Sequence, residues 1–395
     1  MRPAADGLAL PRVPPPAATR HRRRDVVACV LFAAAITAMG LAAFRPHPGA
    51  PDSENRALAP WPAPAPVREF TAGFERAFAD RFGARASLLR LHNRLLVRVF
   101  GVSPAPHVLI GRDGWLFFLG EEGTSFDRYY RGTPALGDAE IARIVAELAR
   151  RARYLASQRI AYVVTIAPDK ATIYPEHLPA WATKRFGASA LARLTDAIRA
   201  EGTIRFVDLR APLEAAKARE RVYYATDSHW NFLGASIAYR EIMRAVADAL
   251  APRPIAIAPV ALPPYVPAVD VYRGDLARMT GDPGPFGEPD YAPLGKVLAT
   301  PQARCARRED DGSKPVFESY ACPRPGLPRA VVYCDSMAIP LVPLLSENFS
   351  HVAYVSSHAL DPAFIARERP DVVIDEMVER AMLAPVATPM PEPAR

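Results

Sequence analysis

Helical and strand-like patterns alternate from Gly137 to Ile374, and this alternation constrains the fold more than any other feature. Strands are predicted where short apolar runs are bounded by turn residues, at Arg159–Ala167, Ile204–Leu209, Ala330–Cys334, His351–Val355 and Asp371–Ile374. Helices are predicted around them, at 138–157, 188–200, 211–219, 231–250, 337–347 and 362–367. Strands joined through helices pair in parallel with right-handed crossovers. The sequence therefore predicts an α/β fold with a parallel sheet flanked by helices.

Other patterns precede and interrupt this alternation. Apolar residues recur at helical spacing from Val67 to Phe100 and predict two helices, whereas 108–118 has the apolar run, turn and apolar run of a β-hairpin. The 42 prolines of the chain are numerous enough to predict long irregular connections. Many of them fall in 252–301, so we expect an irregular insertion of loops and short strands at about 252–328.

The N-terminal region carries an uncharged apolar run from Val26 to Phe44. As a helix this run would rise about 28 Å, close to the thickness of a hydrocarbon core. Arginines between Arg20 and Arg24 precede the run and would hold that end in the cytoplasm. A transmembrane signal anchor is therefore predicted, with a cleaved signal peptide as the alternative, although Ala38-Met39-Gly40 matches a cleavage site poorly.

These features predict the domain organisation. We expect a cytoplasmic tail at 1–25, the anchor at 26–44, a proline-rich linker at 45–66, the globular domain at 67–380 and a disordered tail at 381–395. The formal net charge is +7, but part of that excess lies in the N-terminal arginines. Because no long basic stripe interleaved with aromatic residues is present, nucleic acid is not an expected partner.

Three of the four cysteines bear on the compartment and the site. Cys305 and Cys322 flank a polar, turn-rich segment, so a disulfide is expected if that segment lies in an oxidising compartment. Cys334 ends a predicted strand and is expected to be a packed free thiol.

An aspartate and a histidine stand two residues apart just before the predicted helix at 231–250. In an extended segment, residues i and i+2 project to the same side, so Asp227 can orient the imidazole of His229 and stabilise its cation. Asn231 follows at the expected start of the helix, where it is predicted to be the N-cap. From spacing alone, the Asp227 and His229 pair is more often an ordinary loop pair than half of a catalytic site.

A nucleophile for this pair is predicted at Ser336, directly after the strand Ala330–Cys334. In an open parallel sheet the ligand site lies outside the carboxyl ends of the strands. Asp169, Lys170, the Asp227 and His229 pair, and Ser336 are all expected at such ends or in loops on that side. A serine at a strand-to-helix turn also has its backbone N–H at the positive end of the helix, which suits an oxyanion.

The same segments resemble the AlgJ/AlgX family of SGNH-hydrolase-like O-acetyltransferases. The resemblance runs from about Glu54 to Arg380, and the matching motifs are Glu54-Asn55-Arg56, the Gly111-to-Phe117 stretch GRDGWLF, Pro168-Asp169-Lys170 with Tyr174, Asp227-x-His229-Trp230-Asn231, and Asp335-Ser336. One departure is Cys334, which occupies the position of a glycine in the family's usual Gly-Asp-Ser.

The resemblance implies an SGNH-like sheet and O-acetylation of an alginate-like exopolysaccharide in the periplasm. Ser336 would carry the acetyl group, with His229 as general base and Asp227 as its orienting carboxylate. A membrane-bound O-acyltransferase partner would deliver the acetyl group, and no cofactor or metal is implied. Lys170 and Tyr174 are candidate substrate-binding residues, although Lys170 equally suits a cap on the strand end and Tyr174 suits the core.

Two alternatives stay open at this point. A carbohydrate esterase would use the same three residues, since only competition between water and a sugar hydroxyl at the acyl-enzyme separates the two activities. A non-catalytic polysaccharide-binding subunit is the second alternative, because a side chain at Cys334 can crowd the nucleophile turn.

Overall fold

The computed structural model describes residues 22–42, 59–81, 85–120, 136–183, 190–251, 271–289, 306–307, 316–321, 326–382 and 390–391. The expected Cys305–Cys322 disulfide and the Glu54-Asn55-Arg56 motif lie outside these residues. The chain divides into two compact units, Met1–His92 and Asn93–Arg395.

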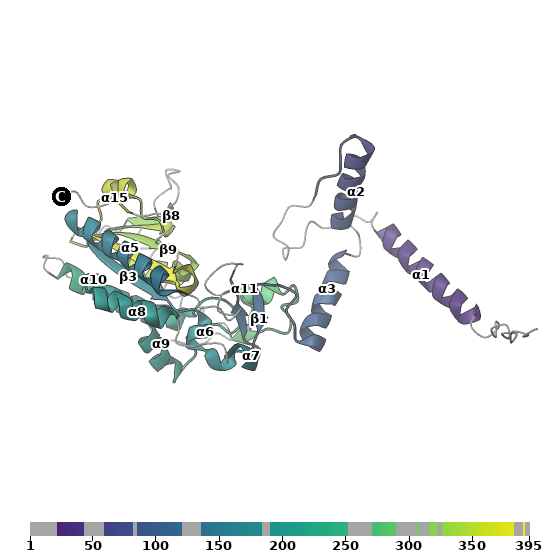
Figure 1. The fold of residues 1–395 in the computed structure, drawn as a ribbon, viewed down its shortest axis with the longest axis horizontal. Helices are drawn as coiled ribbons and strands as arrows, with labels where there is room; N and C mark the ends of the chain where they lie inside the picture. Colours follow the sequence, from purple (N-terminus) through teal and green to yellow (C-terminus); the bar gives the residue numbers. More distant parts are fainter. Residues whose placement is uncertain are drawn as a thin grey trace, which may run out of the picture. The chain divides into compact units, whose positions relative to one another are not determined.

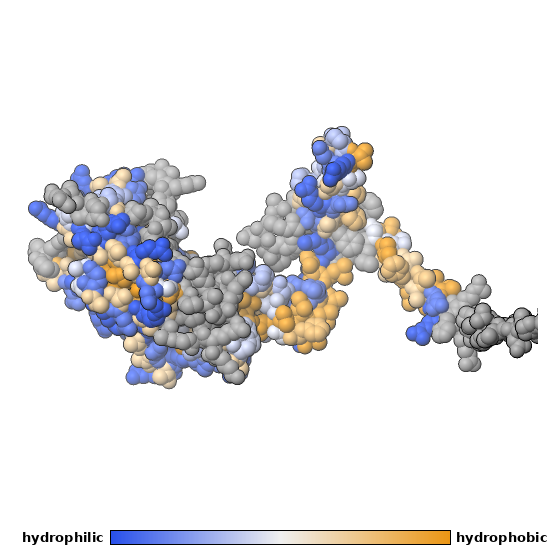
Figure 2. All heavy atoms as spheres, viewed as in Figure 1, coloured by the Kyte–Doolittle hydropathy of each residue, from blue (hydrophilic) through white to orange (hydrophobic). Residues whose placement is uncertain are grey.

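Helices dominate the first unit. They are α1 (Arg22–Ala42), α2 (Val67–Arg81) and the greater part of α3 (Arg85–Leu95), which continues as the π-helical turn η1 (Leu96–Phe100) (Figure 1). In α2, Phe74 stacks between Phe70 and Phe78, with ring centroids 6.3 and 6.0 Å away. Figure 2 shows hydrophobic residues gathered over α1 and α3, where Leu88 and Leu91 are exposed.

The predicted transmembrane anchor is not supported. Helix α1 begins with Arg22-Arg23-Arg24-Asp25 and ends at Ala42, so its apolar part is shorter than the predicted run to Phe44. Among the residues described, no helix is both long enough and apolar enough to cross a membrane.

A seven-stranded sheet with the order β4-β3-β11-β9-β10-β8-β7 organises the second unit. Its strands are β3 (Ala161–Ala167), β4 (Phe206–Asp208), β7 (Ala306–Arg307), β8 (Val316–Ala321), β9 (Arg329–Cys334), β10 (His351–Ser356) and β11 (Val372–Val378). The first five strands in this order are parallel, as predicted. The two strands of the insertion differ: β8 pairs antiparallel with β10, and β7 pairs antiparallel with β8.

The helices of the second unit either cover a face of the sheet or lie outside it (Figure 1). They are α5 (Asp138–Ser157), α6 (Lys170–Ile173), η2 (Pro175–His177), α7 (Ala180–Thr183), α8 (Ala190–Glu201), α9 (Arg210–Lys217), α10 (Phe232–Leu250), α11 (Asp275–Met279), η3 (Ser336–Leu341), α14 (Val342–Ser346), α15 (Pro362–Glu368) and η4 (Glu379–Ala381). The predicted helix at 337–347 is split into η3 and α14, because Pro340 interrupts the α-helical hydrogen bonds.

Two hydrophobic cores follow from the alternation of side chains along the strands. Val332 and Ile374 face α10 and α14 in one core, whereas their neighbours Val331 and Val373 face α5, α8 and α15 in the other. Both faces of the central strands are therefore buried, which explains their continuous apolar runs.

The predicted hairpin is present as β1 (Val108–Ile110) and β2 (Leu116–Phe118), which pair antiparallel. Asp113 and Gly114 have positive φ in the turn that joins them. The described part of the insertion contains α11 and a short antiparallel pair, β5 (Val271–Tyr272) and β6 (Glu288–Pro289). Residues of the hairpin and of this insertion share a third core, so the insertion is packed onto the domain.

Candidate active site

The nucleophile turn begins where β9 ends at Cys334. Asp335 is the N-cap of η3: its Oδ1 accepts from the Met337 N–H at 2.9 Å, and its Oδ2 accepts from the Val378 N–H at 2.7 Å. Burial favours a raised pKa for Asp335, but bonds from His358 and these two N–H groups hold its pKa below the usual range. Ser336 is exposed as the first residue of η3. The turn thus presents the hydroxyl of Ser336 on a fixed backbone.

Cys334 is a free and buried thiol, as predicted. Its side chain packs in the core that faces α10, together with Trp230 and Met337, and burial raises the pKa of the thiol strongly. The side chain at this position is therefore accommodated in the core, away from the exposed hydroxyl of Ser336.

The structure brings the three predicted residues Asp227, His229 and Ser336 together. Nδ1 of His229 lies 2.7 Å from Oδ1 of Asp227, and Nε2 of His229 lies 2.9 Å from Oγ of Ser336. The backbone N–H of His229 also donates to Asp227 Oδ1 at 3.1 Å. One carboxylate oxygen therefore fixes both the backbone and the ring of the histidine.

The loop that carries Asp227 and His229 is tied to its neighbours at its C-terminal end. Tyr223 and Trp230 form an isolated antiparallel bridge, and the indole N–H of Trp230 donates to the carbonyl of Met337 at 2.9 Å. Asn231 is the N-cap of α10, as predicted, and its Oδ1 accepts from the Gly234 N–H at 3.0 Å. The Trp230 bond joins the histidine loop directly to the nucleophile turn.

Two buried charges of opposite sign hold the same loop. Nζ of Lys170 donates to the carbonyls of Tyr224, Ala225 and Asp227 at 3.0, 2.9 and 2.6 Å. Burial lowers the pKa of Lys170 to about 7, and nearby carboxylates oppose this effect. From the insertion, Glu288 accepts from the N–H groups of Ala225 and Thr226, both at 2.7 Å.

Lys170 and Tyr174 do not line the cavity beside Ser336. All three protons of the Lys170 ammonium are used on loop carbonyls, so the ammonium holds the loop that carries Asp227 and His229 and does not cap a strand end. The Tyr174 hydroxyl accepts from the Val222 N–H at 2.9 Å, and its ring packs 4.4 Å from the Trp115 ring. Both side chains are buried and support the loop that carries Asp227 and His229.

The insertion contributes contacts to Asp227 that sequence reasoning missed. The Tyr272 hydroxyl donates to Asp227 Oδ2 at 2.6 Å, and the Asp275 N–H donates to the same oxygen at 2.9 Å. Burial favours a raised pKa for Asp227, but the bonds from His229, Tyr272 and Asp275 outweigh burial and hold its pKa well below the usual range. The run Gly274-Asp275-Leu276 inside a proline-rich stretch was the only sequence signal, and it carries no distinctive spacing.

A cavity of about 340 Å³ opens beside the three residues. Its remaining lining is aromatic and apolar: Tyr224, Trp230, Phe232, Tyr272, Ile339, Pro340 and Pro343. The rings of Tyr224 and Tyr272 pack 4.4 Å apart on its wall. This lining suits an acyl group or the apolar face of a sugar ring better than a charged group.

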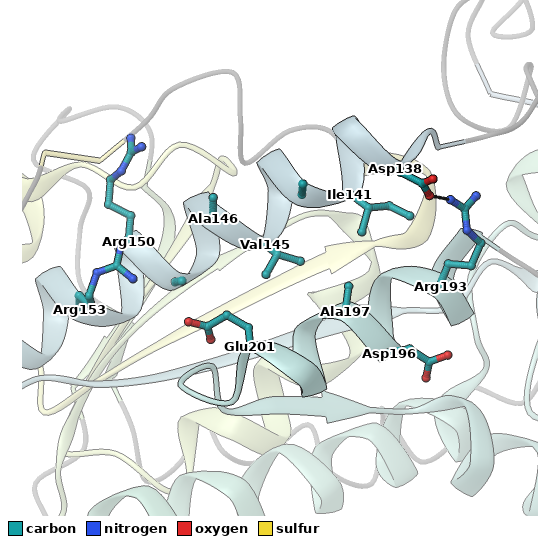
Figure 3. Close-up of a pocket in the computed structure, with 12 residues that line it drawn as sticks. Asp138, Ile141, Val145, Ala146, Arg150, Arg153, Arg193, Asp196, Ala197 and Glu201 are labelled. Carbon is teal, nitrogen blue, oxygen red and sulfur yellow. Dashed lines mark hydrogen bonds and ion pairs between the residues drawn. The ribbon is translucent and has the colours of Figure 1, made fainter.

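A larger hollow of about 830 Å³ lies between α5 and α8 and does not contain the three residues (Figure 3). Alanine, valine and isoleucine side chains form much of its lining, and Asp138 pairs with Arg193 at one end. None of the residues that line it is a serine, cysteine or histidine, so this hollow lacks the groups for acyl transfer.

The described residues contain one group of side chains with metal-ligand geometry. Ligand atoms of Asp227, His229 and Asp275 lie within 4.8 Å of one another. They already bond to each other or to Ser228, Tyr272 and Ser336, which is the arrangement of a proton relay. A histidine with a carboxylate at Nδ1 and a serine at Nε2 can accept the serine proton while the hydroxyl attacks a carbonyl.

In the comparison with known proteins, a family model matches part of this chain. The model described as "SGNH hydrolase-like domain, acetyltransferase AlgX" matches residues 108–312. The match includes the hairpin, Asp227 and His229, and most of the insertion, and it ends before Ser336.

Curated relatives are similar over part of their length. The probable alginate O-acetylase AlgJ of Pseudomonas putida is 33% identical over 146 residues, which are 36% of this chain and 34% of that protein. The probable alginate O-acetylase AlgJ of Azotobacter vinelandii is 25% identical over 268 residues, which are 65% of this chain and 61% of that protein.

Two solved structures are also similar. The O-acetyltransferase domain of Pseudomonas putida AlgJ has a TM-score of 0.45 and 23% identity, over 70% of this chain and 92% of that one. Bacillus cereus PatB1 has a TM-score of 0.46 and 15% identity, over 70% and 97% of the two chains.

Proposed function

Because this chain belongs to the SGNH hydrolase-like family of the acetyltransferase AlgX, we propose that it is an O-acetyltransferase. Its acceptor is a sugar hydroxyl of an alginate-like exopolysaccharide, and Ser336 carries the acetyl group between donor and acceptor. The relatives named as probable alginate O-acetylases support this choice of polymer.

The observation that carries the proposal is the continuous relay from Asp227 through His229 to Ser336, with bonds of 2.7 and 2.9 Å. Its members come from segments 107 residues apart, so local sequence alone does not bring them together. An exposed serine at the start of this relay, beside an apolar cavity, suits acyl transfer.

In the first half-reaction, Oγ of Ser336 attacks the carbonyl carbon of an acetyl donor while its proton passes to Nε2 of His229. Asp227 stays ionised and balances the imidazolium. The tetrahedral intermediate collapses, the bond to the donor breaks, and the leaving group takes the proton from Nε2. The Met337 N–H is engaged by Asp335, so the Ser336 N–H is the backbone group that we assign to the oxyanion.

In the second half-reaction, a sugar hydroxyl attacks the acetyl-Ser336 ester and gives its proton to Nε2. The acetyl group passes to the sugar oxygen, and Oγ of Ser336 leaves and regains its proton from His229. Water in place of the sugar hydroxyl would give the esterase, so exclusion of water from the apolar cavity favours transfer.

We also propose that acetyl groups reach the enzyme from a membrane-bound O-acyltransferase partner, outside the cytoplasm. The family resemblance alone supports this proposal. A fusion of alkaline phosphatase to the C-terminus is expected to be active in cells, because that reporter needs an oxidising compartment. An inactive fusion that is nonetheless produced would contradict the proposed location.

The test of the catalytic proposal is release of acetate from a chromogenic acetyl ester by the full chain. Ser336→Ala, His229→Ala and Asp227→Ala are each expected to lower kcat by about a thousandfold or more, because members of such a relay act as a unit. The matched control is Ser357→Ala, at the serine that follows the neighbouring strand β10, which is expected to leave the rate unchanged. Equal activity of Ser336→Ala and the parent protein would refute the proposal.

An oligosaccharide acceptor separates transferase from esterase. With oligomannuronate in the reaction, mass spectrometry is expected to find acetylated oligosaccharide in the parent protein and none in Ser336→Ala. Ser336-dependent acetate release with no acetylated sugar would assign the protein as an esterase.

A further inference from the structure

We propose that the 271–275 segment of the insertion adjusts the basicity of His229 through two positioning residues that act in opposite directions. Tyr272 draws charge away from Asp227, and Asp275 places a second carboxylate near Nδ1 of His229. This inference rests on the proposed function, in which His229 is the general base.

Tyr272 acts on the outer oxygen of the carboxylate. Its hydroxyl donates to Asp227 Oδ2 at 2.6 Å, while Oδ1 of the same carboxylate faces Nδ1 of His229. A hydrogen bond to one carboxylate oxygen shares the negative charge and weakens the other oxygen as an acceptor. Tyr272 therefore makes His229 a weaker base than Asp227 alone would.

Asp275 places a second carboxylate near the same nitrogen. Its Oδ2 lies 3.8 Å from Nδ1 of His229 and accepts from the Ser228 hydroxyl at 2.5 Å. Its Oδ1 accepts from the Ser228 N–H at 2.7 Å, so the carboxylate is held by both ends. A negative charge at this distance stabilises the imidazolium and makes His229 a stronger base.

The segment lies against the histidine loop too closely for these contacts to be incidental. A Cβ at Gly274 would meet the Thr226 carbonyl oxygen and the Cβ of Asp227, each at 2.4 Å. The Gly274 N–H donates to the Thr226 hydroxyl at 3.0 Å, and the Ala277 N–H donates to the Thr226 carbonyl at 3.1 Å. The backbone contacts of Gly274 and Ala277 with Thr226 thus hold the segment on both sides of Asp275, directly after Tyr272.

Other charged groups face Asp227, Asp275 or Tyr272 from the surrounding elements. They are Lys170 of α6, which interacts with Asp227 and Asp275, Arg278 of α11, which interacts with Tyr272, and Arg380 of η4, which interacts with Asp275. These groups are the same in the parent protein and in the variants below. A difference between parent and variant therefore reports the substituted group.

Two substitutions are expected to move the His229 pKa in opposite directions. Tyr272→Phe should raise it and Asp275→Asn should lower it, each by about half a pH unit, as expected for the loss of one hydrogen bond or one partly exposed charge. The acid limb of kcat/KM on the chromogenic ester should move in the same two directions, because protonated His229 cannot accept the serine proton. NMR titration of the His229 Cε1–H, assigned by its loss in His229→Gln, measures the same pKa without activity.

Three controls accompany the measurement. Tyr320→Phe removes a tyrosine hydroxyl that donates to Glu318 at 3.0 Å on β8, and Asp361→Asn alters the N-cap of α15. Both are expected to leave the His229 titration unchanged. Asp275→Glu retains the charge and is expected to return the His229 pKa most of the way to its value in the parent protein.

The outcomes separate this inference from the proposed function. No movement of the His229 pKa in either variant, or movement of both in the same direction, would overturn the inference. Retention of activity by Ser336→Ala would instead overturn the proposed function, and the NMR titration would still report on Tyr272 and Asp275.

Discussion

Glu379 is a buried carboxyl group that makes two bonds to the short helix α6 and its N-cap, just after β3. Its Oε2 accepts from the Asp169 N–H at 2.9 Å and from the Thr172 hydroxyl at 2.6 Å. Burial raises the pKa of Glu379 to about 7, and the nearby charge of Asp169 adds to the rise. The folded domain therefore holds a proton on Glu379 at pH values where the unfolded chain has released it.

From the raised pKa of Glu379 we predict how the stability of the domain depends on pH. A carboxyl group with a raised folded pKa contributes stability that is fully present below its unfolded pKa and is lost as the pH rises through about 7. We expect the free energy of unfolding to fall by about 2 kcal/mol from pH 5 to pH 8, because Glu379 loses its proton over this range. Glu379→Gln retains an oxygen for both bonds and carries no titrating proton, so urea unfolding at the two pH values should differ less than in the parent. The same difference in both proteins would contradict this role.

At the residue scale, sequence reasoning found the side chains whose chemistry is distinctive. Asp227, His229 and Ser336 were predicted from residue type, spacing and resemblance, and the structure brings them together. Tyr272 and Glu288 were missed because a tyrosine and a glutamate among prolines carry no pattern. Their roles depend on how the insertion packs onto the loop, and this packing cannot be predicted from the local sequence.

At the scale of elements, α10 begins directly after the histidine loop. Its N-cap, Asn231, therefore contacts both the helix and the loop. Oδ1 of Asn231 accepts from the Gly234 N–H at 3.0 Å, and Nδ2 donates to the Arg221 carbonyl at 2.6 Å. One amide thus caps the helix and closes the loop between Arg221 and Trp230. Gly234 is required beside it, because a Cβ there would meet the Val222 carbonyl oxygen at 2.3 Å.

Removal of this amide should affect stability and activity together. Asn231→Ala is expected to lower the free energy of unfolding by about 1–2 kcal/mol, the usual cost of a lost N-cap with a second buried bond. Because Asp227 and His229 move with the loop, kcat on the chromogenic ester should fall as well. Asn231→Ser retains a capping oxygen and should recover the larger part of the stability. A stability loss with unchanged kcat would show that the loop is held without Asn231.

Elements with strong periodicity were predicted well, and elements that depend on distant partners were not. The helix predicted at 138–157 and the strand predicted at 351–355 match α5 and β10 within one residue. In contrast, β8 lies inside the segment predicted to be irregular, and its antiparallel pairing is set by the edge of β10. Pairing partners are chosen by the assembled sheet, so a single strand's sequence does not reveal them.

At the scale of the whole molecule, Arg151 links three regions of the second unit. Its fully buried guanidinium donates to Glu147 on α5 at 3.3 Å, to Asp375 on β11 at 2.9 Å and to the His358 carbonyl at 3.0 Å. The Tyr162 hydroxyl of β3 donates to the same Asp375 oxygen at 2.5 Å. This network fastens α5 to the middle of the sheet.

Substitution of Arg151 should therefore lower the stability of the whole domain. Arg151→Ala leaves Asp375 buried without this cation and is expected to lower the free energy of unfolding by about 3–5 kcal/mol in urea titrations. Arg153→Ala, an exposed arginine on the same helix, should change it by less than about 0.5 kcal/mol. Equal losses in the two variants would argue against the network as the source of stability.

The position of β11 has a consequence for how the sheet is completed. This strand is synthesised last but lies in the middle of the sheet, between β3 and β9. A nascent chain that has not yet delivered β11 contains Asp227, His229 and Ser336, but β3 with β4 and β9 with β10 are then separate pairs. β11 is the strand that joins these pairs into one sheet, because it pairs with β3 on one side and with β9 on the other. A chain that lacks β11 is therefore expected to contain all three residues in an incomplete sheet.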